Sequence, residues 1–194
     1  MRVFLLGFMV GYPKKGENKK MKKVKIALLG IGTVGGGVWD ILQTNKEEIF
    51  NNCGCEIEVV KILVKDSSKK RANSIPQHLF TSNFNSIIMD KEIDIVIEVM
   101  GGIEPAKAYI LAAIREGKHI ITANKALLAN HGDELFKEAK KQGVKLYYEA
   151  SVAGGIPIIH AIKESLTGNK IEKIMGILNG TTNYILTKMT KEGA

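Results

Sequence analysis

A short apolar stretch runs directly into a glycine-rich turn near the start of the chain. Residues 26–29 are apolar, Gly30-Ile-Gly32-Thr-Val-Gly35 follows, and the next residues have the spacing of an amphipathic helix. In such a strand–turn–helix unit the first glycine permits a tight turn, the second lets the backbone approach a pyrophosphate, and the third lets the helix pack against the strand. The helix N-terminus then offers free N–H groups to the anion. The pattern predicts a dinucleotide site; the alternatives are the similar glycine loop of a methyltransferase and a turn without a ligand.

The charge distribution argues against a nucleic-acid partner. The chain has 45% hydrophobic and 25% charged residues, as globular proteins do. Its formal net charge of +8 is concentrated at one end, because residues 1–25 hold eight basic residues and one acidic residue. The rest of the sequence has no basic stripe with interleaved aromatic residues, which a nucleic-acid groove would need.

Residues 1–20 are expected to be a disordered extension outside the fold. Their apolar part, residues 3–10, is too short to cross a membrane as a helix and lacks the small-residue cleavage site of a signal peptide. Met21 then begins a natural lead into the first strand. We therefore expect a cytoplasmic protein without a membrane partner.

The two cysteines, Cys53 and Cys55, are separated by one glycine. They lack the second pair that a zinc site needs, and a disulfide between them would close a strained small loop. We interpret them as reduced thiols in a turn.

Strand and helix patterns alternate along most of the chain. Strands are predicted at residues 24–29, 56–64, 94–100, 117–122 and 145–148, and helices at 33–50, 105–116 and 125–142, with a short helix or turn at 85–90. This alternation predicts an α/β fold with a doubly wound parallel sheet and right-handed crossovers. Ligands of such sheets bind at the carboxyl ends of the strands, where the glycines and polar residues of this chain gather. After residue 155 we expect a helix at 156–166, a strand at 173–178 and a second helix start within 179–189.

Five segments together resemble the homoserine dehydrogenase family. They are GxGTVG at 30–35, VIEVMGG at 96–102, ITANKALLA at 121–129, YEASVAGGIP at 148–157 and GILNGTTNYIL at 176–186. The last three are specific, and all five occur in the family's order. The resemblance implies an NAD- or NADP-dependent interconversion of L-homoserine and L-aspartate-4-semialdehyde, in threonine, methionine and isoleucine biosynthesis. It also implies a Rossmann domain at residues 21–150 and the start of an α+β catalytic and dimerisation domain at 151–194.

The resemblance assigns candidate cofactor residues. These are Gly30, Gly32, Thr33, Val34, Gly35, Lys65, Gly101 and Lys125. Lys65 and Asp66 end the second predicted strand, where an acid favours the free 2′-hydroxyl of NAD and a base favours the 2′-phosphate of NADP. Because the family match implies that Lys65 binds this phosphate, NADP is favoured over NAD.

Further roles also come from the resemblance. Lys125 is the candidate catalytic residue, near nicotinamide and substrate, since a cation there can bind a carboxylate or assist proton movement. Glu98, which could be taken for a general base, is expected to be structural. The predicted ligands of a monovalent cation, Na⁺, are Glu149, Val152, Gly154 and Ile156. The predicted substrate loop is Asn179, Gly180 and Thr181, whose alternative role is to cap a helix.

The sequence departs from the family pattern at its end. The family's acidic residue for the substrate amine, and the aspartate and lysine of proton transfer, lie downstream of the position that corresponds to Ala194, so Lys125 is the only retained catalytic candidate. We therefore expect either a homoserine dehydrogenase or an NAD(P)-binding fragment or regulatory module without turnover. The family implies a homo-oligomer, and the incomplete second domain is expected to expose apolar surface and self-associate.

Overall fold

The computed structural model describes residues 22–69, 75–177 and 179–193. The described chain divides into two compact units, with the boundary after Pro157. The expectation that residues 1–20 are disordered lies outside the described residues. Within the described ranges, no helix combines the length and the apolar character that crossing a membrane requires.

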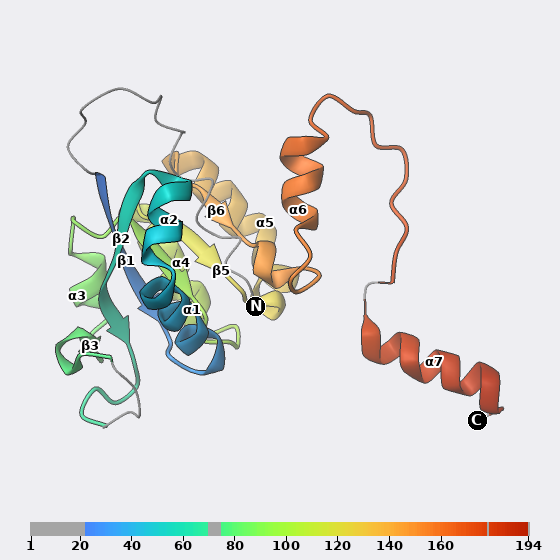
Figure 1. The fold of residues 1–194 in the computed structure, drawn as a ribbon, viewed down its shortest axis with the longest axis horizontal. Coiled ribbons are helices and arrows are strands. Elements are labelled where there is room, and N and C mark those ends of the chain that lie inside the picture. Colours follow the sequence, from blue (N-terminus) through green and yellow to red (C-terminus); the bar gives the residue numbers. More distant parts are fainter. Residues whose placement is uncertain (1–21, 70–74, 178, 194) are drawn as a thin grey trace. The chain divides into compact units, whose positions relative to one another are not determined.

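The first unit contains a parallel sheet of six strands in the order β3-β2-β1-β4-β5-β6 (Figure 1). The strands are β1 (Lys22–Leu29), β2 (Cys55–Leu63), β3 (Phe80–Thr81), β4 (Ile95–Glu98), β5 (His119–Thr122) and β6 (Leu146–Tyr147). Both β2 and β4 pair in parallel with β1, so the strand order reverses beside β1. This topology confirms the predicted doubly wound α/β sheet, and the reversal marks the place where ligands of such sheets bind.

Helices cover both faces of this sheet (Figure 1). They are α1 (Thr33–Thr44), α2 (Lys46–Cys53), α3 (Asn85–Ile88), α4 (Ala106–Arg115) and α5 (Lys125–Gln142). Along β1, Ile26 and Leu28 pack in the core that contains α1, whereas Ala27 and Leu29 pack in the core that contains α4. Successive strand residues point to opposite faces, so a strand buried on both faces must be continuously apolar. The apolar run before the glycine turn therefore forms the central strand.

The helix predicted at residues 33–50 is two helices. α1 ends at Thr44, whose hydroxyl donates to the Asp40 carbonyl oxygen, and Asn45 leaves the helical conformation with φ −111° and ψ 27°. Threonine and asparagine compete with helix bonds through such local contacts. Two glutamates in the first turn of α2 then favour a new helix start. The chain thus turns before β2 instead of continuing one long helix.

One edge of the sheet was missed by the sequence patterns. A 3-10 turn, η1 (Gln77–Leu79), leads into the two-residue strand β3, and the Val64 amide donates to the Thr81 carbonyl oxygen at 2.9 Å. A strand this short shows no alternation that a sequence pattern could reveal. β3 nevertheless matters, because it brings the following loop to the carboxyl edge of β2.

The second unit consists of helices and extended chain. α6 (Ile158–His160) continues as a π-helix, η3 (Ala161–Ser165), and α7 (Gly180–Glu192) follows. The strand predicted at 173–178 is wrong for residues 173–177, which form no strand, while residue 178 lies outside the described residues. A strand needs a hydrogen-bonded neighbour, and the described residues of this unit supply none. Ile174, Met175 and Ile177 are 64%, 78% and 73% exposed.

Candidate dinucleotide-binding site

A cavity of about 470 Å³ lies at the carboxyl edge of the first unit's sheet. Its walls are the glycine turn at residues 30–32, the end of β2 at 63–65, Ser82 after β3, residues 99–100 after β4, and Pro105 and Tyr109 at the start of α4. These segments flank the reversal of strand order beside β1. The volume is in the range of small-molecule sites, and the location is the one that doubly wound sheets use.

The glycine turn has the shape that a pyrophosphate site needs. Gly30 has φ +102°, and a Cβ there would lie 3.1 Å from the Val99 carbonyl oxygen. A Cβ on Gly35 would overlap the carbonyl oxygen of Gly30, so this glycine permits close packing of α1. A Cβ on Gly32 would meet open space. Gly30 and Gly35 are thus required by the turn itself, and Gly32 leaves room for an approaching ligand.

The first turn of α1 has backbone donors available. Gly32 is the N-cap residue, and no side chain among the described residues caps this helix. The Gly36 amide makes the first helix bond, to Gly32, at 2.8 Å, so the amides of Thr33, Val34 and Gly35 precede the helix's own bonding. With the positive end of the helix dipole, these amides suit a pyrophosphate.

Lys65 and Asp66 differ in their surroundings. Lys65 is exposed and lines the cavity at the end of β2. The Oδ1 atom of Asp66 accepts hydrogen bonds from the amide and the hydroxyl of Ser68, at 2.9 and 2.6 Å. The carboxylate therefore stabilises its own loop, and the lysine provides the charge on the cavity wall.

A buried polar network links the ends of β4 and β5. Glu98 is fully buried, and its carboxylate accepts from the Met100 amide at 2.9 Å and from the Thr122 hydroxyl at 2.6 Å. The Thr122 Oγ1 atom also accepts from the Asn124 amide at 3.0 Å. With its carboxylate engaged in this way, Glu98 fits the structural role expected from the sequence and does not line the cavity.

Lys125 and Gly101 lie at the same edge but outside the cavity lining. Asn124 caps α5 by accepting from the Leu127 amide, and its Nδ2 atom donates to the Gly102 carbonyl oxygen at 2.6 Å. Lys125 is therefore the first residue of a fixed helix and is exposed. Gly101 has φ +75° in the loop that Asn124 holds. Their contacts with a cofactor stay predictions.

The predicted cation loop is a series of tight turns. Glu149 begins the 3-10 turn η2 (Glu149–Ser151), and Ser151 donates to the Thr122 carbonyl oxygen at 2.9 Å. Val152 follows, and Gly154 has φ +61°. Across the described residues no group of three or more histidine, cysteine, aspartate or glutamate side chains could hold a metal. The predicted sodium site, which ends at Ile156, would instead use one carboxylate and several backbone carbonyl oxygens. Sodium binding therefore stays a prediction.

The predicted substrate loop belongs to the second unit, where it begins α7. The Asn179 Oδ1 atom accepts from the Thr182 amide at 2.7 Å, which is the capping role considered as the alternative. Gly180 and Thr181 form the first turn of this helix. Substrate contact by these residues stays a prediction.

Both cysteines are unbridged, as expected from the sequence, and both are buried. Cys53 ends α2 and Cys55 begins β2, so only Gly54 lies in the predicted turn. The Cys53 thiol donates to the Ile49 carbonyl oxygen at 2.7 Å. Burial, followed by the neighbouring Cys55, raises the pKa of the Cys53 thiol to about 11. The Cys53 thiol therefore stays protonated at neutral pH.

Sequence reasoning missed the aromatic side of the cavity. Pro105 and Tyr109 are four residues apart at the start of α4, so both face the cavity from one side of the helix. The signal was present, since this helix was expected to begin at the carboxyl edge. Ser82 had no such signal, because its position depends on the short strand β3.

The sheet order, the glycine turn and the cavity at the strand reversal define a dinucleotide-binding protein of the Rossmann type. The family model for the NAD-binding domain of homoserine dehydrogenase matches residues 30–149, and the homoserine dehydrogenase model matches residues 157–194. The chain belongs to the homoserine dehydrogenase family.

Known relatives are similar over most of this chain. The homoserine dehydrogenase of Bacillus subtilis is 49% identical over 172 residues, which are 89% of this chain and 40% of the relative. A homoserine dehydrogenase structure from Thiobacillus denitrificans has a TM-score of 0.78 at 48% identity, covering 90% of this chain and 40% of that one. A hyperthermophilic archaeal homoserine dehydrogenase in complex with NADPH has a TM-score of 0.70 at 28% identity, covering 89% and 57%. The chain thus spans about 40% of the length of the first two relatives.

Proposed function

We propose that this chain is the NADP-binding part of an enzyme that interconverts L-homoserine and L-aspartate-4-semialdehyde, in threonine, methionine and isoleucine biosynthesis. The observation that carries the proposal is the cavity beside β1, bounded by the glycine turn on one side and Lys65 on another. The first turn of α1 would bind the pyrophosphate. Membership of the family supports the reaction.

NADP is preferred to NAD in this proposal because of the charges after β2. A 2′-phosphate beside Lys65 would gain a charge-assisted hydrogen bond, and the Oδ1 atom of Asp66 already accepts two hydrogen bonds from Ser68, which makes it less available to a ribose hydroxyl. The NADPH in the archaeal relative's complex supports the same cofactor.

The residues of this chain would bind and orient the reactants. The bound cofactor supplies a hydride acceptor or donor. Lys125, fixed at the start of α5, would hold the substrate carboxylate or assist proton movement. The polar groups of Asn179, Gly180 and Thr181 would contact the substrate, and the turns from Glu149 to Ile156 would bind Na⁺. We further propose a homo-oligomer, as the family implies.

A second candidate is an NAD(P)-binding module without turnover. The observation in its favour is that residues of the first unit alone line the cavity, and that Lys125, the candidate catalytic residue, is not among them. The two candidates share the cofactor site and differ in homoserine-dependent reduction of the cofactor.

The test measures cofactor binding and turnover separately. Titration calorimetry with NADP⁺ and NAD⁺ should give tighter binding of NADP⁺, and Lys65→Ala should weaken NADP⁺ binding about tenfold or more while changing NAD⁺ binding little. Lys69→Ala, an exposed lysine of the same loop, is the matched control. Failure of the unmodified chain to bind either nucleotide would refute both candidates. Binding without homoserine-dependent absorbance at the reduced nicotinamide band would favour the module.

A further inference from the structure

We infer that the aromatic pair Phe84–Tyr109 is the binding surface for the adenine base of the cofactor. This inference rests on the proposed NADP site. It assigns residues to the part of that site that would bind the base, whereas the glycine turn and Lys65 are assigned to the phosphates. The ligand class is a planar purine attached to the ribose of a dinucleotide.

The two rings are stacked on each other, and Tyr109 is the one of the two that lines the cavity. The ring centroids of Phe84 and Tyr109 are 3.9 Å apart, and the ring planes differ by 22°. Tyr109 lines the cavity together with Pro105, one helical turn earlier in α4. Because Phe84 covers one face of the tyrosine ring, a ligand in the cavity would meet the other face or the ring edge. Purines stack on such rings regardless of their hydrogen-bonding pattern.

The position of the pair follows the path of a bound dinucleotide. In folds of this kind the pyrophosphate lies at the glycine turn and the adenosine ribose at the end of the second strand, here beside Lys65. The base attached to that ribose must extend to the remaining walls of the cavity. These walls include Val64 and Ser82, which follow β2 and β3, and Tyr109 on α4. A purine at these walls would have an apolar side chain and an aromatic ring as neighbours.

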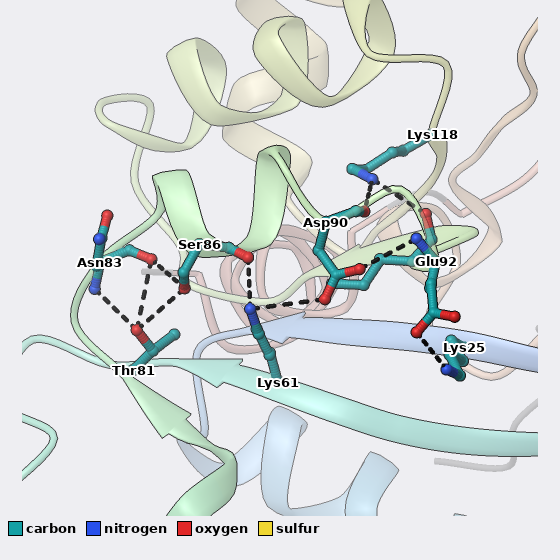
Figure 2. Close-up of polar contacts among 9 residues, drawn as sticks. Lys25, Lys61, Thr81, Asn83, Ser86, Asp90, Glu92 and Lys118 are labelled. Atoms are coloured by element: carbon teal, nitrogen blue, oxygen red, sulfur yellow. Dashed lines mark hydrogen bonds and ion pairs between the residues drawn. The ribbon is translucent and has the colours of Figure 1, made fainter.

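Hydrogen bonds and an ion pair within the chain hold the loop that carries Phe84. Lys61, on β2, donates to the Ser86 carbonyl oxygen and forms an ion pair of 3.6 Å with Asp90 (Figure 2). The Asn83 amide donates to the Thr81 hydroxyl at 3.1 Å, and the Ser86 hydroxyl donates to the Asn83 carbonyl oxygen at 2.8 Å (Figure 2). These contacts tie both flanks of Phe84 to β2 and β3. The aromatic surface is therefore formed before a cofactor binds, which reduces the ordering cost of binding.

The experiment measures binding of NADP⁺ and of adenosine 2′,5′-bisphosphate to the full chain by titration calorimetry. Tyr109→Leu keeps apolar bulk but removes the aromatic face, so both ligands should bind about tenfold more weakly. Tyr109→Phe keeps the face and should bind both ligands within about twofold of the unmodified chain. Tyr184→Leu, a change of the same kind at an exposed tyrosine of α7, should leave both affinities unchanged.

A direct readout covers the case in which Tyr109→Leu disturbs folding. In the unmodified chain with labelled tyrosine rings, adenosine 2′,5′-bisphosphate should shift the ring signals of Tyr109, identified by their loss in Tyr109→Phe, and should show magnetisation transfer from the purine protons. Binding of NADP⁺ without these effects, and with equal affinity in Tyr109→Leu, would overturn the adenine surface and leave the proposed function intact. Absence of NADP⁺ binding by the unmodified chain would overturn both.

Discussion

The Glu98 carboxylate accepts a hydrogen bond of 2.6 Å from the Thr122 hydroxyl and so joins the carboxyl ends of β4 and β5 from inside the sheet edge. Its other oxygen accepts from the Met100 amide, in the segment that forms the cavity wall after β4. The Thr122 hydroxyl in turn accepts from the Asn124 amide at the start of α5. One buried carboxylate thus fixes both the cavity wall and the helix that presents Lys125.

We predict that Glu98→Gln destabilises the chain by about 1–3 kcal/mol. The two carboxylate oxygens of Glu98 accept from different donors, whereas a glutamine amide has a single acceptor oxygen, so one buried donor would be left unsatisfied. Urea unfolding followed by circular dichroism measures the change. Glu104→Gln, at an exposed glutamate of the following loop, is the control and should unfold like the unmodified chain. Equal midpoints for Glu98→Gln and the control would show that the network does not depend on a carboxylate.

The glycine turn gives a prediction that separates folding from binding. Gly30→Ala should lower the free energy of unfolding by more than about 1 kcal/mol, since Gly30 has φ +102° and its Cβ would press on the Val99 carbonyl. Gly32→Ala should fold normally, because its Cβ meets open space and its φ is −74°. It should instead weaken NADP⁺ binding by obstructing the approach of the pyrophosphate. Thermal unfolding and titration calorimetry test the pair, and an undiminished affinity in Gly32→Ala would contradict this placement.

The sequence predicted the sheet because its signals are local. The apolar run of β1, the glycine turn and the start of α5 at Lys125 each depend on a few neighbouring residues, and all three were found where expected. β3 and Ser82 were missed because their position depends on pairing with β2, a contact distant in the sequence. The strand predicted at residues 173–178 is wrong for residues 173–177 because of the same dependence on distant pairing. Its pattern is apolar, but a strand also requires a neighbour.

The candidate site was predictable to the same extent. Gly30, Gly32 and Lys65, three of the predicted cofactor residues, line the cavity, and their contact with a cofactor stays a prediction. Tyr109 was not predicted, because its stacking on Phe84 joins two elements that the sequence does not place together.

The cysteines give a prediction about reactivity and pH. Cys53 is buried with its thiol pKa raised to about 11, so iodoacetamide at pH 7.5 should leave the folded chain unmodified and label it after denaturation. The ordinary pKa of the thiol is 9.0, so the unfolded chain loses this proton first as pH rises. The stabilising contribution is therefore complete below pH 9 and is lost between pH 9 and about 11. Cys53→Ala should show a smaller loss of stability over this interval, and rapid labelling of the native chain would contradict the burial.

Lys118, which is buried at the opposite edge of the sheet, should stabilise the fold through two hydrogen bonds. Its ammonium donates to the Asp90 carbonyl oxygen at 2.6 Å (Figure 2). It also donates to the Ile93 carbonyl oxygen at 3.1 Å, and so holds the turn before β4. Lys118→Met keeps the length of the side chain but leaves both carbonyls without this donor, which should cost about 1–3 kcal/mol in urea unfolding. Lys91→Met, at an exposed lysine nearby, is the matched control and should cost little.

Burial lowers the pKa of Lys118, so the folded chain releases this proton before the unfolded chain does. The contribution of Lys118 to stability should then rise with pH below its ordinary pKa of 10.5, opposite in sign to that of Cys53. The difference in unfolding free energy between the unmodified chain and Lys118→Met, measured between pH 7 and 10, tests this sign, and a difference that shrinks with pH would show that the charged form is the one that the fold favours.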